Sequence, residues 1–240
     1  MPRFFVPDDL AAGRILTLPD NVVRHMQVLR LRAGGEVVFF NGNGRAYPAR
    51  LVKLEKRTAV AEITAEGPSE NMPPLAITLI QAVSAGERMD FTLQKSVELG
   101  VTEIIPVISE RSVVRLSGER AEKRVARWQE IVIAACEQSG RNRIPPVRPL
   151  QNYTAALNTL PADRLKLLMS LNRAEKLSSL PPPKAVLFMV GPEGGWTAAE
   201  EAAAFDAGFQ AITLGNRILR TETASLAAIA AMQTLWGDFA

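Results

Sequence analysis

The sequence predicts an α/β protein of two domains, a small β-rich one followed by a larger one built on a parallel sheet. Two observations support this expectation. Up to about residue 68, apolar and polar residues alternate in short runs, which is the period of half-buried strands. From about residue 75, continuous apolar runs alternate with helical patterns, as in a parallel sheet that is covered on both faces. A chain of 240 residues is long enough to hold both domains.

The N-terminal domain, residues 1–68, contains three strand signals and one helix signal. The runs "EVVFF", "YPARLVKL" and "TAVAEIT" are typical of strands, and a Gly/Asn turn at Asn41–Gly44 separates the first two. A short helix is expected around Asn21–Leu31. The Pro-, Gly- and Ser-containing segment Glu66–Pro74 is typical of a linker, and we place the linker between the domains at residues 69–74.

The second domain, residues 75–240, is expected to alternate strands with helices. Strands are predicted at the runs "AITLIQAV", "EIIPVI", "RLKLLMSL", "AVLFMV" and "AITL". Helices are predicted at 87–100, 118–139, 153–160, from Thr197 onward and from about Ala224 onward. Open parallel sheets bind ligands at the carboxyl ends of their strands, so the loops after "AVLFMV" and "AITL" are the candidate binding loops.

Composition excludes several classes of site. Cys136 is the only cysteine, so the chain has no internal disulfide or thiolate cluster, and its helical spacing to Trp128 and Val132 favours core packing over a nucleophile. His25 is the only histidine, which argues against a Ser-His-Asp triad and a zinc site, and we expect no bound metal. The apolar runs are too short for a signal peptide or a membrane span, so we expect a cytoplasmic protein without a membrane partner.

The positive charge is concentrated near the N-terminus. The formal net charge is +3, and residues 1–68 hold ten Lys/Arg against seven Asp/Glu. Three of these cations, Arg24, Arg30 and Arg32, lie close together in "RHMQVLRLR". A basic N-terminal domain points to an anionic partner, with nucleic acid first.

The first candidate loop, "VGPEGGWTAAE", spans Val190–Glu200. Its three glycines allow a ligand to approach the backbone closely, and Thr197 with Glu200 matches the capping box of a following helix. The spacing is that of neither phosphate-binding glycine motif, and Glu193 would repel a phosphate. The loop suits a ligand that is neutral or cationic near Glu193, although an ordinary strand-to-helix turn would use similar residues.

The second candidate loop, "LGNRILRTETAS", spans Leu214–Ser225. Either Thr221 or Thr223 is expected to cap the last helix, and Glu222 suits a helix N-terminus. Arg217 and Arg220 do not suit this place, because the helix dipole disfavours cations near a helix N-terminus. Two arginines in this place indicate anion recognition, and the alternative is that they are solvated loop charges.

Five blocks together, "RHMQVLRLR", "QKSVELGV", "EQSGR", "GPEGGWTAAE" and "LGNRILRTETA", resemble the ribosomal RNA small subunit methyltransferase E family of the SPOUT superfamily. The resemblance runs from "RFFV" to the last helix. It implies a C-terminal SPOUT-type α/β domain with a trefoil knot, an N-terminal PUA-like β-barrel that binds RNA, and a homodimer. The implied activity is S-adenosyl-L-methionine-dependent methylation of N3 of a specific uridine in 16S rRNA of the small ribosomal subunit.

The resemblance also implies which residues act. The cofactor would be bound by Leu168, Met169, Val190, Gly191, Pro192, Glu193, Gly194, Gly195, Leu214, Gly215, Arg217, Ile218, Leu219, Thr223 and Ala224. The RNA would be bound by Arg24, His25, Arg30, Arg32 and Arg141. We expect Arg220 to stabilise the uracil anion or to anchor a phosphate, since a guanidinium offers forked donors to oxygen. Glu222 and Glu193 are assigned lesser roles, as proton acceptor or orienting group.

Two other interpretations stay open at this point. A nucleotide-binding oxidoreductase or kinase would share the doubly wound sheet, but the missing phosphate motifs argue against it. A non-catalytic rRNA-binding assembly factor would share the basic N-terminal domain. Calorimetry with S-adenosylmethionine, NAD and ATP separates the first alternative, and methyl incorporation into rRNA separates the second.

Overall fold

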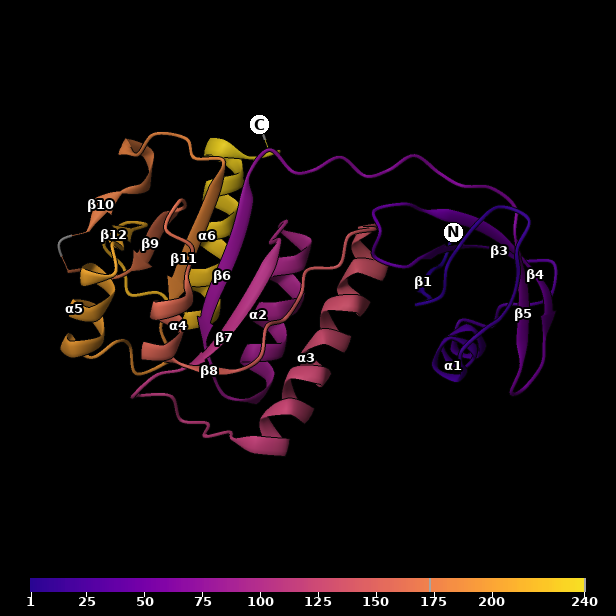
Figure 1. Ribbon diagram of the computed structural model, residues 1–240, viewed down its shortest axis with the longest axis horizontal. Helices are drawn as coiled ribbons and strands as arrows, with labels where there is room; N and C mark the ends of the chain where they lie inside the picture. The colour runs from indigo at the N-terminus through magenta and orange to yellow at the C-terminus, as the bar shows by residue number, and fades with distance from the viewer. Residues whose placement is uncertain (173, 240) are drawn as a thin grey trace. The chain divides into compact units, whose positions relative to one another are not determined.

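The computed structural model describes residues 1–172 and 174–239, which form two compact units (Figure 1). The first consists of Met1–Met72 with Cys136–Ile144, and the second of Pro73–Ala135 with Pro145–Ala240. The segment Cys136–Ile144, which was predicted to belong to the second domain, groups with the first unit because the half-buried Glu70 binds it there. Glu70 Oε2 accepts hydrogen bonds from the backbone N–H groups of Asn142 and Arg143 at 2.6 and 3.0 Å.

The first unit is a five-stranded sheet with one helix. The strands are β1 (Arg3–Phe5), β2 (Ile15–Thr17), β3 (Glu36–Phe40), β4 (Tyr47–Leu54) and β5 (Ala59–Ile63), and the helix is α1 (Asp20–Val28). The strand order is β1-β3-β4-β5-β2, with β1 parallel to β3 and the other pairs antiparallel. The alternation predicted for β4 and β5 is confirmed, since their inward side chains join one buried core with those of α1. β1 and β2 were not predicted, because three residues carry too little periodicity.

The second unit contains a seven-stranded sheet in which every neighbouring pair is parallel, as predicted. Its strands are β6 (Ala76–Ala82), β7 (Glu103–Ile108), β8 (Gln151–Asn152), β9 (Leu165–Met169), β10 (Glu175–Lys176), β11 (Ala185–Val190) and β12 (Gln210–Thr213). The order is β10-β12-β9-β11-β6-β7-β8. β9 therefore lies between β11 and β12, and the loops that follow these three strands are brought to one edge of the sheet.

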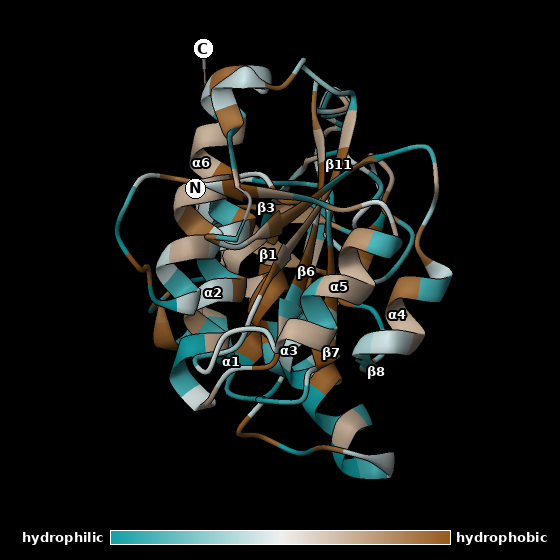
Figure 2. Ribbon diagram, turned by 90° about the vertical axis from the view of Figure 1, so that its left-hand side faces the viewer, coloured by the Kyte–Doolittle hydropathy of each residue, from teal (hydrophilic) through white to brown (hydrophobic). Residues whose placement is uncertain are grey.

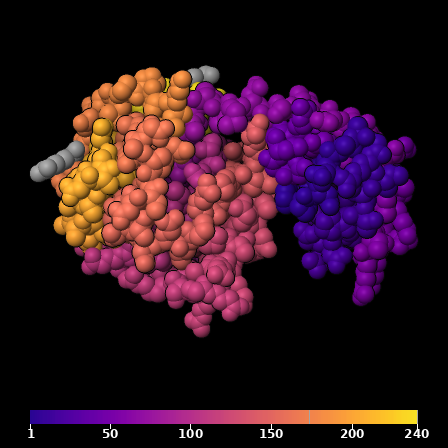
Figure 3. Space-filling model, viewed as in Figure 1, coloured from indigo at the N-terminus to yellow at the C-terminus, as the bar shows by residue number. Residues whose placement is uncertain are grey.

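Helices cover both faces of this sheet, as continuous apolar strands require. They are α2 (Gly86–Glu98), α3 (Gly118–Ser139), α4 (Tyr153–Thr159), α5 (Ala198–Asp206) and α6 (Thr221–Trp236), with a short 3-10 helix η1 (Leu177–Ser179). Figure 2 shows α2 and α6 on one side of the sheet and α4 and α5 on the other. In the space-filling view, α4 and α5 lie side by side over their face (Figure 3).

The two predicted helix starts had different outcomes. The capping box of α5 is confirmed: Thr197 Oγ1 accepts from the Glu200 N–H, and the Glu200 carboxylate accepts from the Thr197 N–H. The start of α6 was predicted wrongly, because the helix begins at Thr221 instead of near Ala224. Neither threonine caps it: Arg220 occupies the N-cap position, and its side chain makes no capping hydrogen bond. The trefoil knot stays a prediction from the resemblance.

Candidate functional site

A cavity of about 770 Å³ lies at the carboxyl ends of β9, β11 and β12. Three loops form its walls: 169–172 after β9, 190–196 after β11, and 213–224 after β12. Arg88 from α2 and Glu201 from α5 complete the lining. The two loops selected by the strand-end rule thus meet at one cavity, because β11 and β12 are separated in the sheet only by β9.

Most of the predicted site residues line this cavity. The lining includes Met169, Val190, Gly191, Pro192, Glu193, Gly194, Gly195, Leu214, Arg217, Ile218, Leu219, Arg220, Glu222 and Ala224. Three predicted cofactor residues lie outside it. Leu168 is fully buried in the core one position before the cavity wall, Gly215 is exposed with a φ of +104°, and Thr223 is exposed.

Two glycines of the loop after β11 pack so closely that a side chain at either position would push its neighbour aside. A Cβ at Gly191 would lie 3.2 Å from the indole ring of Trp196, and a Cβ at Gly194 would lie 3.1 Å from Cβ of Arg111. Arg111 also binds the loop from outside, since its Nη1 donates to the carbonyls of Gly194 and Trp196 at 2.9 and 3.2 Å. Because Gly191 and Gly194 have no Cβ, the loop exposes its backbone at these two positions of the cavity wall.

Glu193 connects this loop to the start of α2. Its Oε1 accepts hydrogen bonds from the Ala85 N–H and from Arg88 Nη1, both at 3.0 Å. Burial raises the pKa of Glu193, but the backbone N–H groups and the Arg88 guanidinium outweigh it and hold the pKa below its usual value. Its charge is therefore matched within the protein, so the geometry favours the orienting role over proton acceptance.

The loop after β9 is held by an acid from α5. Ser170 Oγ donates to Glu201 Oε1 at 2.5 Å, and Asn172 Nδ2 lies 3.3 Å from Glu201 Oε2. Sequence reasoning did not find Ser170, Glu201, Arg88 or Arg111. Their signal is weak, because serines and charged residues in loops and on helix surfaces are common and these contacts join distant parts of the chain.

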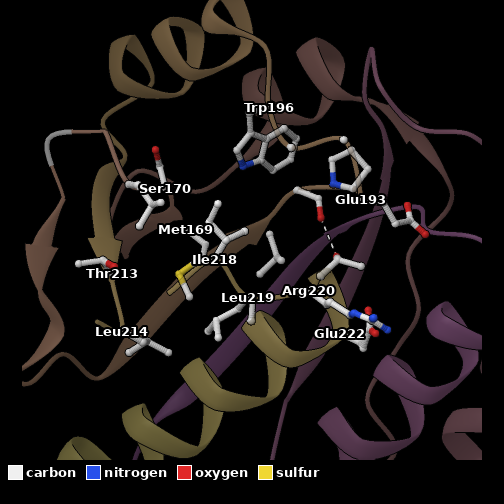
Figure 4. A pocket seen from close by; sticks show the side chains of 18 of the residues that line it. Met169, Ser170, Glu193, Trp196, Thr213, Leu214, Ile218, Leu219, Arg220 and Glu222 are labelled. Carbon is white, nitrogen blue, oxygen red and sulfur yellow. Dashed lines mark hydrogen bonds between the residues drawn. The ribbon is translucent and has the colours of Figure 1, made fainter. Parts of the chain in front are cut away.

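The cavity has two chemically different ends (Figure 4). Met169, Thr213 and Leu214 lie at one end, whereas Arg220 and Glu222 lie next to each other at the start of α6 on the side of Glu193. Glu222 Oε2 and Trp196 Nε1 are buried and have no hydrogen-bond partner among the described residues. A buried carboxylate oxygen and an indole N–H without partners are costly unless a ligand binds them.

The residues expected to bind RNA lie in the first unit. Arg24, Arg30 and Arg32 are exposed on α1 and the segment after it. His25 is partly engaged already: its Nδ1 lies 3.6 Å from Glu137 Oε2, and its ring packs edge-on against Phe4 at 5.2 Å. Arg141 is half-buried, in the segment that closes this unit. The structure thus groups the three arginines as accessible cations and gives His25 a packing role.

Cys136 is buried, as the helical spacing predicted. Burial raises the pKa of its thiol to about 12. Among residues 1–172 and 174–239, no group of three or more His, Cys, Asp and Glu side chains has the geometry of a metal site. No helix in the described part of the chain has the length and apolar character needed to cross a membrane.

Two family models match the chain, an RNA methyltransferase domain over residues 71–233 and an RNA methyltransferase PUA domain over residues 18–64. The chain is 32% identical to the ribosomal RNA small subunit methyltransferase E of Buchnera aphidicola, over 100% of this chain and 95% of the relative. A solved ribosomal RNA small subunit methyltransferase E from Neisseria gonorrhoeae, bound to S-adenosyl methionine, is 63% identical with a TM-score of 0.97, covering 100% of both chains. A solved protein from Legionella pneumophila, in complex with the cofactor SAM, is 34% identical with a TM-score of 0.95 over 99% and 98% of the two chains.

Proposed function

This chain belongs to the ribosomal RNA small subunit methyltransferase E family, and we propose that it transfers the methyl group of S-adenosylmethionine to N3 of a uridine in the rRNA of the small ribosomal subunit. The observation that carries the proposal is the cavity with two chemically different ends. One end offers apolar side chains such as Met169 and Leu214, and the other offers Arg220 and the unpaired carboxylate oxygen of Glu222 on the side of Glu193 in the glycine loop (Figure 4).

The described residues fit the cofactor. The loops 169–172, 190–196 and 213–219 provide backbone groups and apolar side chains for an adenosine, and the indole N–H of Trp196 lacks a partner. No lysine or arginine lies within the glycine loop, so that loop suits a ligand without phosphates. When bound, S-adenosylmethionine supplies an already activated methyl group, so that the transfer depends mainly on placement of the acceptor.

The acceptor side requires more from the protein. N3 of uridine carries an imide proton that is mostly retained at neutral pH, so a group must accept this proton or stabilise the anion that its loss leaves. We assign stabilisation of the anion, or anchoring of the target phosphate, to the guanidinium of Arg220. Glu222 is the better proton acceptor of the two acids, because its buried Oε2 has no partner among the described residues while Glu193 is bound to Arg88.

The experiment that tests the function uses unmodified small subunits, labelled cofactor and mass spectrometry of the digested rRNA. The expected product is N3-methyluridine at one position. Failure to find this nucleoside with both naked rRNA and assembled subunits would refute the proposal. Replacing Arg220 by Ala should abolish transfer while the cofactor dissociation constant changes by only about a few fold, because the arginine acts on the acceptor.

We also propose a homodimer, supported by an apolar face on two packed helices. On α6, Ala227, Ala230 and Ala231 are half-buried and Leu235 is 46% exposed, and the four recur at helical spacing. Phe91 on α2, which packs against α6, is 46% exposed. Exposed apolar side chains on adjacent elements are typical of an interface. Light scattering of the wild type should give a mass of about twice the chain mass of 26.1 kDa. The Ala230→Glu variant should give the mass of a single chain. A wild-type mass equal to that of one chain would refute the dimer.

The rRNA substrate also assigns a role to the first unit. Arg24, Arg30 and Arg32 are accessible cations on a PUA-like fold, and we assign them phosphate contacts that position the RNA. His25 and Arg141 are assigned to the same RNA surface. We place the protein in the cytoplasm, where small ribosomal subunits are found.

A further inference from the structure

A buried polar network lies beneath the cavity, and neither the proposed mechanism nor the family comparison assigns it a role. It joins the side chains of Gln81, Thr221 and Ser225 to the backbone carbonyl of Gly191, and we call it the Gln81 network. Gln81 and Ser225 are fully buried, and Thr221 is 5% exposed. Gln81 interrupts the apolar strand β6, which is an unusual place for an amide unless all of its hydrogen bonds are satisfied.

The orientation of the Gln81 amide follows from its neighbours. Its Nε2 lies 3.0 Å from the carbonyl oxygen of Ala82, which can only accept, so this atom is the nitrogen. The second hydrogen of Nε2 is donated to Thr221 Oγ1 at 3.0 Å, and Oε1 lies 2.7 Å from the Ser225 hydroxyl. Every polar atom of the Gln81 side chain thus has a partner.

The same geometry decides where the Thr221 hydroxyl points its hydrogen. Because Oγ1 accepts from Gln81, the hydroxyl hydrogen is available for the carbonyl of Gly191, which lies 2.6 Å away. One hydroxyl therefore connects the interior strand β6, the glycine loop and the first turn of α6. Serine would reproduce both hydrogen bonds, whereas valine has nearly the shape of threonine and would make neither.

The position of Thr221 in the chain gives this contact its functional meaning. It lies directly between Arg220 and Glu222, the two residues assigned to the acceptor, and Gly191 begins the loop assigned to the cofactor. Resting on the proposed function, we propose that Thr221 is a positioning residue whose hydroxyl links the cofactor loop to the acceptor groups. A ligand that orders the glycine loop then also orders the first turn of α6.

Steady-state kinetics with Thr221→Val and Thr221→Ser test this link. The valine variant should lower kcat by about 100-fold, because small misplacements of acceptor groups have effects of this size. Its KM for S-adenosylmethionine should change by about threefold or less, since the cofactor walls remain. The serine variant should recover most of kcat. A valine variant with a kcat within about threefold of the wild type, or a serine variant as slow as valine, would overturn the proposal.

Two further variants guard against a trivial loss of folding. Thr102→Val, just before β7, is a matched control, because this half-buried hydroxyl also donates to a backbone carbonyl of another element, that of Ile77 in β6 at 2.9 Å, but lies outside the cavity. It should keep the wild-type rate. If Thr221→Val does not fold, Gln81→Met tests the same network. It should lower kcat by about tenfold, because the Thr221 hydroxyl loses the donor that directs its hydrogen to the carbonyl of Gly191. An unchanged kcat in Gln81→Met would then overturn the proposal.

Hydrogen exchange gives a readout that does not depend on methyl transfer. In the wild type, S-adenosylmethionine should slow amide exchange in residues 190–196 and also in residues 220–225. In Thr221→Val it should slow exchange only in residues 190–196. Equal protection of both segments in this variant would refute the link. If the wild type binds the cofactor but forms no methylated nucleoside, the proposed function fails, and the exchange pattern still decides the role of Thr221.

Discussion

Replacing Glu200 by Ala should destabilise the second unit without touching the cavity surface. Glu200 is only 7% exposed. The two oxygens of its carboxylate accept hydrogen bonds from two backbone N–H groups that lie on different elements. Oε2 accepts from Thr197 at 2.9 Å within the capping box of α5, and Oε1 accepts from Glu110 at 2.8 Å in the loop after β7. The substitution removes both acceptors at once.

The expected loss follows from these two donors. A buried N–H left without a partner costs about 1–3 kcal/mol, and the lost charge at the helix N-terminus adds about 0.3–1 kcal/mol. Because Glu110 is exposed, water can reach part of its backbone and replace some of the lost hydrogen bonding. The summed loss of stability therefore lies in the lower half of what these two ranges allow. We therefore expect the free energy of unfolding to fall by about 2–4 kcal/mol.

Urea unfolding followed by tryptophan fluorescence measures this loss in the right unit. All three tryptophans, Trp128, Trp196 and Trp236, belong to the second unit, so their emission reports on it alone. The matched control is Glu119→Ala, which also removes an acid from a first helical turn, but one whose side chain is 77% exposed. The control should lose less than about 1 kcal/mol. Equal losses in both variants would show that the dipole, and not the buried hydrogen bonds, accounts for the role of Glu200.

Three further outcomes are expected. Gly191→Ala should weaken binding of S-adenosylmethionine by about tenfold or more in calorimetry, because its Cβ would lie 3.2 Å from Trp196; Gly208→Ala, outside the cavity, should leave the affinity unchanged. Burial raises the pKa of the Cys136 thiol to about 12 from its ordinary 9.0, so between these pH values the thiol ionises only in the unfolded chain. The free energy of unfolding should therefore fall as the pH rises through this window. Urea titration followed by circular dichroism measures the fall, which should be smaller in Cys136→Ala. Replacing Arg24, Arg30 and Arg32 by Gln should flatten the salt dependence of rRNA binding, measured by filter binding. An unchanged slope would contradict the assignment of phosphate contacts to these arginines.

Local signals in the sequence predicted several parts of the structure. The capping box of α5 depends on residues three apart, and the burial of Cys136 depends on neighbours within two helical turns, so both are visible in a short window. The apolar runs predicted a parallel sheet, and the strand-end rule selected two of the three loops that line the cavity. The third loop came from the family resemblance.

Other features depended on contacts between distant residues. The strands β8 and β10 have two residues each and exist because a neighbouring strand offers hydrogen bonds, so no local period indicates them. The acid Glu193 suggested a ligand of particular charge, but Arg88, which lies 105 positions away, already neutralises it.

The start of α6 shows the same division most clearly. From the sequence alone, Thr221 and Thr223 are good caps and the charges between them point to a binding loop. In the fold, the hydroxyl of Thr221 is bound to Gln81 and Gly191, which lie 140 and 30 positions away in sequence. The amino-acid sequence by itself determined which residue types reach the cavity, because periodicity and capping act over a few residues. Only the tertiary structure decided which of them are committed to one another, because a buried hydrogen bond depends on the strand order that brings distant segments together.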